Sequence, residues 1–594
     1  MGRNKSSCGK HFINKLIFSD GSEVSPRRIN VIIGPNNTGK SRLLKEIRSE
    51  ILGHPSNYGS PDYPKYLLSD IITTFPKTVN EIEEEYGPLK HIVAKTPGGW
   101  RVREYCNTGI QINPDGSFSR YPQATIYTPD ILDLRETLAS SNHDSIQFKQ
   151  FFGPLFVGYS GTEDRLLLAS GEPARGVASS DYNTLSSALD VDPLLSSISN
   201  TTKALFNKDV ILDVVTDRQK VSPIVCPDFS EYRNSVSGSH APDSSKLANA
   251  TKLSEEGDGF KSFVSVLLSI IGNKKPVYLL DEPEAFLHPP FAMEMGHEIA
   301  SLISMANARD CQLFIASHSS YLIRGILAEM SRLNQLDELR IIRLTRDKNL
   351  TQAHVIGNDA IQRIVSTTGF TPAYIDALFS TIPVLTEGPR DAELYTQITS
   401  KLLPQQDTLF VSVNGKQNFQ NKLSFYRDSG SRPRIIADFD ILKSVDQFKK
   451  VMESANVSEH QIACHVPTAN KLFTYVSKKA DQLYPSDEAG KRSKEAKEYL
   501  SGQYRFVDYQ SINEYEHGLS EKINDLINEL IQYGILIIRT GIMETIFPEM
   551  ESKGNKEHSD TWYYDAIDFV SSSENETLSS NSFVKDLISL IESR

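Results

Sequence analysis

Two pairs of acidic residues in the C-terminal half of the chain are well suited to metal chemistry. Glu387 and Asp391 follow one short apolar run, and Asp438 and Asp440 follow another. Each run reads as a buried strand, so both pairs are expected where neighbouring parallel strands end. Hard cations such as Mg²⁺ or Mn²⁺ prefer oxygen ligands, and without a cation these carboxylates would repel one another. The pattern predicts a divalent-metal site; the alternative is a helix cap and a polar loop.

The N-terminal half carries a phosphate-binding loop. An apolar run at 29–33 leads into GPNNTGKS at 34–41, and a helical pattern follows. A strand, this loop and a helix together make a P-loop, whose backbone amides hold nucleotide phosphates. Lys40 is expected at the terminal phosphates, and the Ser41 hydroxyl on Mg²⁺. The other residues assigned to the nucleotide are Gly34, Asn36, Asn37 and Gly39.

Two further strand ends are expected to complete the nucleotide site. The apolar run 276–280 leads to Asp281 and Glu282, the form of a Walker B strand. In such a strand the Asp holds Mg²⁺ and the Glu polarises the attacking water. The run 312–316 precedes His318, whose imidazole is expected near the γ-phosphate. The sequence thus predicts ATP and Mg²⁺ as cofactors.

Together these motifs resemble the head domain of ABC-type ATPases. The sequence LSEEGDG at 253–259 stands where that family has its signature motif, which contacts the γ-phosphate of the partner protomer. The resemblance makes Ser254, Gly257 and Gly259 candidate nucleotide contacts and implies a homodimer or higher homo-oligomer. Two acids before Gly257 depart from the usual LSGGQ wording, which puts efficient hydrolysis in doubt. The alternative is a glycine-containing turn before a helix.

The second half resembles the Toprim module of topoisomerases, primases and nucleases, through its order of strand, Glu-Gly-x-x-Asp, helix, strand and Asp-x-Asp. An ABC-type head followed by a Toprim module resembles the OLD family of ATP-dependent nucleases. That resemblance implies metal-dependent cleavage or nicking of DNA and a role in bacterial anti-phage systems, Gabija-like or retron-associated. It also implies another acid, Glu544, and a catalytic lysine, for which Lys553 and Lys556 are both in range. The alternative for Glu544 is a charge in the first turn of a helix.

The expected fold class is α/β, with an ABC-type P-loop ATPase domain followed by a Toprim domain built on a Rossmann-like parallel sheet. We place the ATPase head at 1–370, with an insertion at about 130–250 as a candidate dimerisation region. The Toprim nuclease domain takes 371–594. Its insert at 442–530 interleaves lysines with aromatic residues, as for contact with DNA phosphates and bases. The alternating Lys and Glu at 488–498 are also typical of a solvated helix.

Composition sets the broad class. The chain has 594 residues, of which 39% are hydrophobic and 23% charged, which indicates several globular domains. A net charge of −12 argues against indiscriminate coating of nucleic acid but leaves room for a local basic path. Five scattered cysteines without a C-x-x-C pair fit a reducing compartment and no structural zinc. With no apolar run long enough for a bilayer, we expect a cytoplasmic protein without a membrane partner.

These features favour an ATP-binding, metal-dependent DNA endonuclease or nickase whose ATPase head regulates the Toprim site. The alternatives are a nucleotide-gated nucleic-acid sensor or scaffold that does not cut, and an SMC-like or RecF-like DNA-repair ATPase. The sequence leaves open DNA versus RNA, whether ATP drives or restrains cutting, and a defence partner such as a helicase, a reverse transcriptase or a structured nucleic acid.

Overall fold

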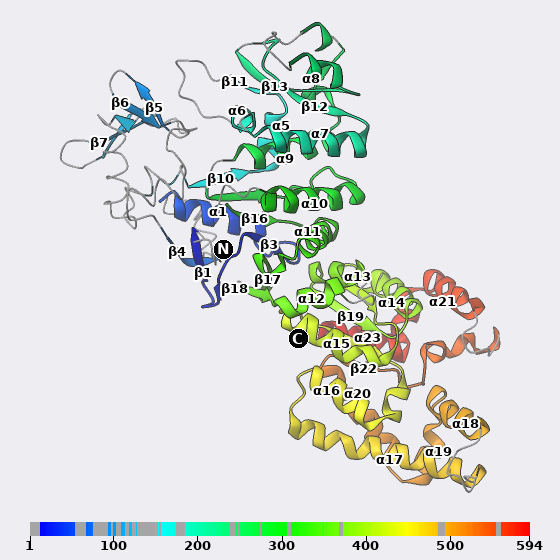
Figure 1. The fold of residues 1–594 in the computed structure, drawn as a ribbon. Helices are drawn as coiled ribbons and strands as arrows, with labels where there is room; N and C mark the ends of the chain where they lie inside the picture. The colour runs from blue at the N-terminus through cyan, green and yellow to red at the C-terminus, as the bar shows by residue number, and fades with distance from the viewer. Residues whose placement is uncertain are drawn as a thin grey trace, which may run out of the picture. The chain divides into compact units, whose positions relative to one another are not determined.

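Two parallel sheets organise the chain, one in each of the units Met1–Thr368 and Gly369–Arg594 (Figure 1). The computed structural model describes residues 12–53, 67–74, 93–96, 99–102, 109–112, 118–121, 126–127, 149, 153, 156–173, 184–189, 191–217, 219–236, 244–247, 249–273, 275–305, 311–347, 350–366, 372–484, 494–553 and 560–593. The chain is therefore an α/β protein with parallel-containing sheets.

The first unit contains a six-stranded sheet of order β10-β15-β16-β3-β17-β18. Its strands are β3 (Ile29–Ile33), β10 (Val157–Ser160), β15 (Val277–Asp281), β16 (Gln312–Ala316), β17 (Leu339–Asp347) and β18 (Leu350–Ile356). All neighbours pair in parallel except β17 and β18. Because parallel strands end at the same edge, the loops after β3, β15 and β16 are adjacent there.

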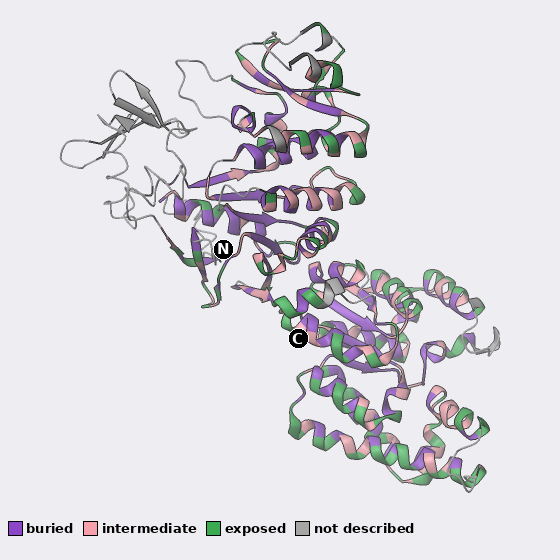
Figure 2. Ribbon diagram, in the orientation of Figure 1, coloured by how far each residue is buried: buried purple, intermediate pink, exposed green. Residues whose placement is uncertain are grey.

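A hydrophobic core on one face of this sheet fixes the helix that follows the P-loop. It joins the sheet to α1 (Lys40–Ile51) and to the small antiparallel sheet of β1 (Ile13–Phe18), β2 (Glu23–Val24) and β4 (Leu68–Thr73). Leu43, Leu44 and Ile47 give α1 an apolar stripe that is fully buried. Figure 2 shows that the strands of the sheet are mostly buried, while the helices have one buried and one exposed side.

The remaining helices of this unit include α9 (Asp258–Gly272), α10 (Pro289–Met305), α11 (Ser320–Arg332) and α12 (Asn358–Ser366). Helices α10 and α11 pack so closely that a Cβ atom on Gly325 would lie 1.9 Å from the Met293 carbonyl oxygen, so the contact needs a glycine there. The unit also has the short strands β5 (Val93–Thr96), β6 (Gly99–Val102), β7 (Gly109–Ile112), β8 (Phe118–Tyr121) and β9 (Ile126–Tyr127).

Between β10 and α9 the chain forms an outer lobe. Its helices are α5 (Thr162–Leu168), α6 (Thr184–Ala188), α7 (Asp192–Phe206) and α8 (Ser230–Val236), with the short turns η3 (Ser244–Leu247) and η4 (Leu253–Glu255). Its antiparallel strands are β11 (Glu172–Pro173), β12 (Asp209–Asp213), β13 (Lys220–Cys226) and β14 (Thr251–Lys252). The insertion predicted at 130–250 falls mostly here, although 128–148 and 174–183 lie outside the described residues. Its role in dimerisation stays a prediction.

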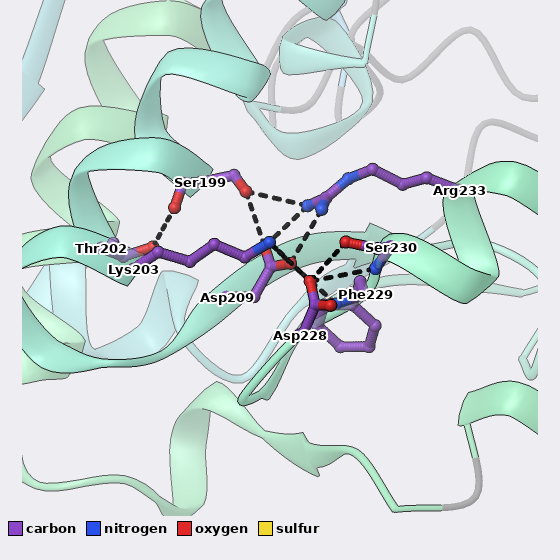
Figure 3. Close-up of polar contacts among 8 residues, drawn as sticks. All are labelled: Ser199, Thr202, Lys203, Asp209, Asp228, Phe229, Ser230 and Arg233. Atoms are coloured by element: carbon purple, nitrogen blue, oxygen red, sulfur yellow. Dashed lines mark hydrogen bonds and ion pairs between the residues drawn. The ribbon is translucent and has the colours of Figure 1, made fainter.

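A buried carboxylate ties this lobe together (Figure 3). Asp209, at the start of β12, accepts hydrogen bonds from Arg233 of α8 at 2.6 and 2.7 Å, from the Ser199 hydroxyl of α7 at 2.6 Å and from the Phe229 amide at 2.8 Å. The Lys203 ammonium lies 2.9 Å away. Burial opposes the charge of Asp209, but these donors outweigh it and hold the pKa of this carboxyl well below its ordinary value.

Replacing Asp209 by Asn should destabilise the outer lobe, because Arg233 and Lys203 lose the negative charge that they share. We expect a loss of about 2–3 kcal/mol, less than for a wholly buried pair because both cations keep about a third of their surface exposed. The depressed pKa of Asp209 means that its stabilisation is complete above about pH 4 and is lost as the pH falls further.

Hydrogen exchange measured for residues 199–233 tests this expectation. After correction for intrinsic exchange, the opening free energy of the wild type should fall steeply between about pH 4 and 2, while that of Asp209→Asn should fall less. If the opening free energies of the two proteins had the same dependence on pH, ionised Asp209 would not be the group that stabilises the outer lobe.

The second unit is built on a four-stranded parallel sheet of order β20-β19-β21-β22. The strands are β19 (Ile382–Thr386), β20 (Thr408–Ser412), β21 (Arg434–Ala437) and β22 (Ile535–Ile537). β19 and β21 are neighbours, as expected for strands that bring two acidic pairs to one edge. The flanking helices include α13 (Pro372–Asp376), α14 (Pro389–Leu402), α15 (Phe419–Asp428), α21 (Asp560–Ser572), α22 (Asn575–Ser580) and α23 (Ser582–Glu592).

The insert between β21 and β22 is helical where it is described. It contains α16 (Val445–Ser454), α17 (Glu459–Leu483), α18 (Lys494–Arg505), α19 (Tyr509–Tyr515) and α20 (Leu519–Gln532). On α18, Lys494 and Lys497 are exposed and Lys494 lies 3.6 Å from Glu498, as on a solvated helix. DNA contact by this insert stays a prediction. Among the helices of the described ranges, none has the length and hydropathy that a membrane crossing needs.

Candidate functional sites

The P-loop connects β3 to α1 with a backbone that only glycine accommodates. Gly34 has φ +139° and Gly39 has φ +99°, and a Cβ atom on Gly34 would lie 2.2 Å from the Leu344 carbonyl oxygen. Asn36 and Asn37 are exposed, and Asn37 also has a positive φ of 61°. The loop therefore has the conformation and exposure needed to present backbone amides to an anion ahead of a helix N-terminus.

The two charged or hydroxylic residues at the start of α1 are held in place by the surrounding loops. The Lys40 ammonium donates to the carbonyls of Gly34 and Pro35, both at 2.8 Å. Burial lowers the pKa of Lys40 to about 8, against the opposing influence of two nearby carboxylates. The Ser41 hydroxyl donates to Asp281 at 2.8 Å. The sequence-predicted pair of Mg²⁺ ligands, one from each motif, is thus in direct contact.

The carboxyl ends of β15 and β16 add three groups to this site. Asp281 also accepts a hydrogen bond from the Tyr159 hydroxyl at 3.1 Å. Glu282 Oε1 lies 3.3 Å from His318 Nε2. Burial and the Lys40 ammonium lower the pKa of His318, which favours a neutral imidazole at neutral pH. Tyr159 was not identified from the sequence, because nothing local marks it.

Glu284 is another residue that sequence reasoning did not assign. Its Oε1 accepts from the Ser317 hydroxyl and from the His318 amide, both at 2.8 Å. Burial raises the pKa of this carboxyl. Glu284 therefore fixes the loop after β16, and with it the imidazole of His318, to the loop after β15.

The signature-like segment begins α9. Ser254 lies half-buried in η4, Gly257 precedes the helix and is exposed, and Gly259 packs against the loop after β15. A Cβ atom on Gly259 would lie 2.9 Å from the Phe286 carbonyl oxygen, so this packing needs a glycine. The turn-and-helix interpretation is correct as local structure, while nucleotide contact by this segment in a second protomer stays a prediction.

One of the two acids that break the signature wording has a local partner. Glu256 forms an ion pair with Lys208, which follows α7. Lys208 also lies over the Phe260 ring, 5.2 Å from its centroid. The extra negative charge of Glu256 is thus balanced within the outer lobe.

In the second unit, the predicted metal-binding carboxylates are brought together. Glu387 follows β19 and its Oε1 accepts from the Asp438 amide, after β21, at 3.3 Å. Asp440 follows in the short turn η8 (Phe439–Lys443). Asp391 accepts from the Gly388 amide at 2.7 Å, so the helix-cap interpretation holds for it as local structure. Glu544 lies in the turn η9 (Met543–Thr545) after β22, and this turn, rather than an α-helix, follows the strand.

The pKa values of these carboxyl groups reflect their burial and their proximity to one another. Burial and the Asp440 carboxylate raise the pKa of Glu387 to about 7. Burial and the carboxylates of Glu387, Asp391, Asp440 and Glu544 raise the pKa of Asp438 well above its ordinary value. Mutual repulsion of this kind favours uptake of a proton or of a cation.

The donor set suits a hard cation, but it is not already arranged around one. All five candidate side chains offer oxygen, and Asp440 Oδ1 is buried without a hydrogen-bond partner among the described residues. Lys416, in the turn η7 (Lys416–Asn418), forms an ion pair with Asp440 Oδ2. In the described part of the chain, no three His, Cys, Asp or Glu side chains have the spacing of a ready metal site. Metal binding here therefore requires the carboxylates to move closer.

The catalytic lysine predicted at Lys553 or Lys556 is not located. Lys553 ends the turn η10 (Pro548–Lys553), and only its backbone is described, while Lys556 lies outside the described residues. Lys416 is the cation that the structure brings to the acids, and the sequence offered no reason to select it from its turn.

Comparison with known proteins supports the assignment of the first unit. The protein family described as "AAA domain, putative AbiEii toxin, Type IV TA system" matches residues 180–324, which include most of the outer lobe, the signature-like segment and the Walker B strand. No curated protein matches the sequence.

Solved structures similar to this chain include three SMC heads. One is the SMC head domain from Thermotoga maritima, with 13% identity and a TM-score of 0.27 over 58% of this chain and 97% of that chain. Another is an SMC head bound to the C-terminal winged-helix domain of ScpA, with 13% identity and a TM-score of 0.30 over 58% and 98%. The third is the Pyrococcus furiosus SMC head with an extended coiled coil, bound to the C-terminal domain of ScpA, with 12% identity and a TM-score of 0.30 over 60% and 98%.

The geometry and the family match define the class of the first unit. A P-loop, a Walker B pair and a histidine lie at one edge of a parallel sheet, and the matched AAA family covers the last two. The first unit therefore has the motifs of a P-loop nucleotide-binding domain, and part of it is similar to the AAA-domain family.

Proposed function

We propose that the chain is an ATP-binding, divalent-metal-dependent DNA endonuclease or nickase of the OLD type, in which the ATPase head regulates a Toprim active site. The observation that carries the proposal is a second gathering of carboxylates, at the edge of a second parallel sheet, in a unit separate from the P-loop. The OLD resemblance adds a role as a cytoplasmic effector of bacterial anti-phage defence.

In the head, the P-loop amides and Lys40 would bind the ATP phosphates, while Ser41 and Asp281 would hold Mg²⁺. Glu282 would polarise the attacking water, and the neutral imidazole of His318 would orient the γ-phosphate. The exposed start of α9 is available to a second copy of the chain, where Ser254 and the two glycines would close the site. ATP binding would then assemble a homodimer.

In the second unit, Glu387, Asp391, Asp438, Asp440 and Glu544 would hold Mg²⁺ or Mn²⁺. Such cations supply an activated water and neutralise charge on a phosphodiester. The Asp438 amide donates to the Glu387 carboxylate, which holds the acids that follow β19 and β21 together at the end of the sheet. Lys416 places a positive charge beside these acids, where it can stabilise the phosphate, and Lys553 has that role by family resemblance.

Purified protein incubated with supercoiled, linear and single-stranded DNA tests this function. We expect nicked or linearised plasmid with Mg²⁺ or Mn²⁺, no product in EDTA, and a rate that changes when ATP is added. The same reactions with RNA decide the nucleic acid. Full-length substrate under every condition of metal, nucleotide and oligomeric state would contradict the proposal.

One observation favours a second candidate function, a nucleotide-gated nucleic-acid sensor or scaffold that does not cut. Lys416 already neutralises Asp440, and the described carboxylates are not spaced for a metal. In this alternative the acidic residues and Lys416 form a structural salt bridge, and the protein binds DNA without cleaving it.

A further inference from the structure

A buried arginine spans the end of the Walker B strand. Arg165, on α5, is 0% exposed. Its Nη1 donates to the carbonyls of Ser160 at 3.0 Å and Asp281 at 2.9 Å, and its Nη2 donates to the carbonyl of Glu282 at 2.8 Å. The guanidinium therefore joins the ends of β10 and β15 just beyond the point where their ladder of hydrogen bonds stops.

This contact is not an ion pair. No carboxylate of the described residues lies within ion-pair distance of Arg165, and its remaining hydrogen-bond partner among them is the Thr162 hydroxyl at 3.2 Å. Arg165 Nε is buried without a hydrogen-bond partner among the described residues, so the bonds from Nη1 and Nη2 to the backbone carbonyls are what hold this buried charge in place. In turn, a planar fork with two adjacent donors fixes two consecutive carbonyls in one orientation.

Arg165 donates hydrogen bonds to a backbone segment that is strained at Glu282. Glu282 has φ +47°, a conformation that residues other than glycine seldom adopt, and it precedes Pro283, which further restricts it. Such a conformation costs about 1–3 kcal/mol and persists only where the surroundings impose it. Here the Glu282 amide donates to the Ala316 carbonyl at 2.9 Å, and the Glu282 carbonyl accepts from Arg165. In this backbone conformation, Glu282 Oε1 lies 3.3 Å from His318 Nε2.

We propose that Arg165 is a positioning residue for ATP hydrolysis, which holds the strained turn at Asp281 and Glu282 so that the Glu282 carboxylate lies where it polarises the attacking water. This inference rests on the proposed ATPase function. Arg165 is too deep to contact nucleotide itself, so its effect belongs to turnover and not to binding.

The test compares Arg165→Lys and Arg165→Met with the wild type in the full chain. The lysine keeps the charge but donates from a single nitrogen, so it cannot reproduce the planar fork that reaches three carbonyls from two nitrogens, and the methionine removes the donors. We expect kcat for ATP hydrolysis to fall about tenfold in the first and about 100-fold in the second, while the Kd for ATP changes less than about threefold. Equal losses in kcat and in affinity, or an unchanged kcat, would overturn the inference.

Two further variants separate positioning from a general loss of stability. Leu168→Ala removes a buried side chain from the same helix and leaves the arginine, so it should lower the Tm without lowering kcat per folded molecule by more than about twofold. In a Glu282→Gln background, Arg165→Lys should cost less than about twofold more, because its effect acts through Glu282. Full additivity of the two losses would refute the idea. If Glu282→Gln alone has no effect, the proposed hydrolysis mechanism fails instead.

Discussion

The double variant Asp438→Ala, Asp440→Ala should lose DNA cleavage by about a thousandfold or more while its ATP turnover stays at the wild-type level. The two carboxylates lie in the unit that does not contain the P-loop, so the Walker Mg²⁺ site keeps all of its ligands. Removal of two metal ligands eliminates water activation and charge stabilisation together, which explains the size of the expected loss. The measurement is a plasmid-nicking rate beside a phosphate-release rate on the same preparation.

Damage to the fold would not account for such a loss, because neither carboxylate is needed to stabilise the unit. Burial and the charges of its neighbours raise the pKa of Asp438, so removal of this carboxylate relieves an unfavourable charge. Removal of Asp440 breaks only its partly exposed ion pair with Lys416, so the Tm of the double variant should change little. Asp446→Ala is the matched control, since Asp446 is an exposed acid on α16 six positions beyond Asp440. Cleavage at the wild-type rate by the double variant would remove the nuclease role from these acids, and a loss of only a few-fold would assign them to substrate positioning.

Local patterns in the sequence were sufficient to place the elements that position both sites. Apolar runs become parallel strands in β3, β15 and β19 that are buried along all or nearly all of their length, because both faces of such strands are covered. A chemically active residue at the end of each strand then falls at a shared edge without further information. This is why Lys40, Ser41 and Asp281 could be joined from positions 240 residues apart.

The supporting residues could not be found in that way. Tyr159, Arg165 and Lys416 contact the sites only through the tertiary arrangement of neighbouring strands and turns. Arg165 in particular belongs to a short helix whose pattern indicates an ordinary amphipathic segment. Its function depends on the register of β10 against β15, which no local pattern encodes.

ATP must bind to the head before it is hydrolysed, so two single variants should separate the affinity for ATP from the rate of hydrolysis. Lys40→Ala should weaken ATP binding by about 100-fold or more, because its ammonium is held at the P-loop carbonyls of Gly34 and Pro35, where it would supply positive charge to the phosphates. Glu282→Gln should bind ATP within about threefold of the wild type and hydrolyse it about 100-fold more slowly, since it removes the group that polarises water but no phosphate contact. Calorimetric titration and phosphate release measure the two quantities.

The contrast between these variants also decides how the head controls the second unit. Lys45→Ala, an exposed lysine on the same helix, is the control and should behave as wild type in both assays. If ATP binding alone regulates cutting, Glu282→Gln with ATP should cut DNA like the ATP-bound wild type, and Lys40→Ala should behave like the nucleotide-free protein. If hydrolysis is required, both variants should resemble the nucleotide-free protein, because neither can complete the cycle. Unchanged ATP affinity in Lys40→Ala would show instead that the loop at 34–41 does not hold the nucleotide.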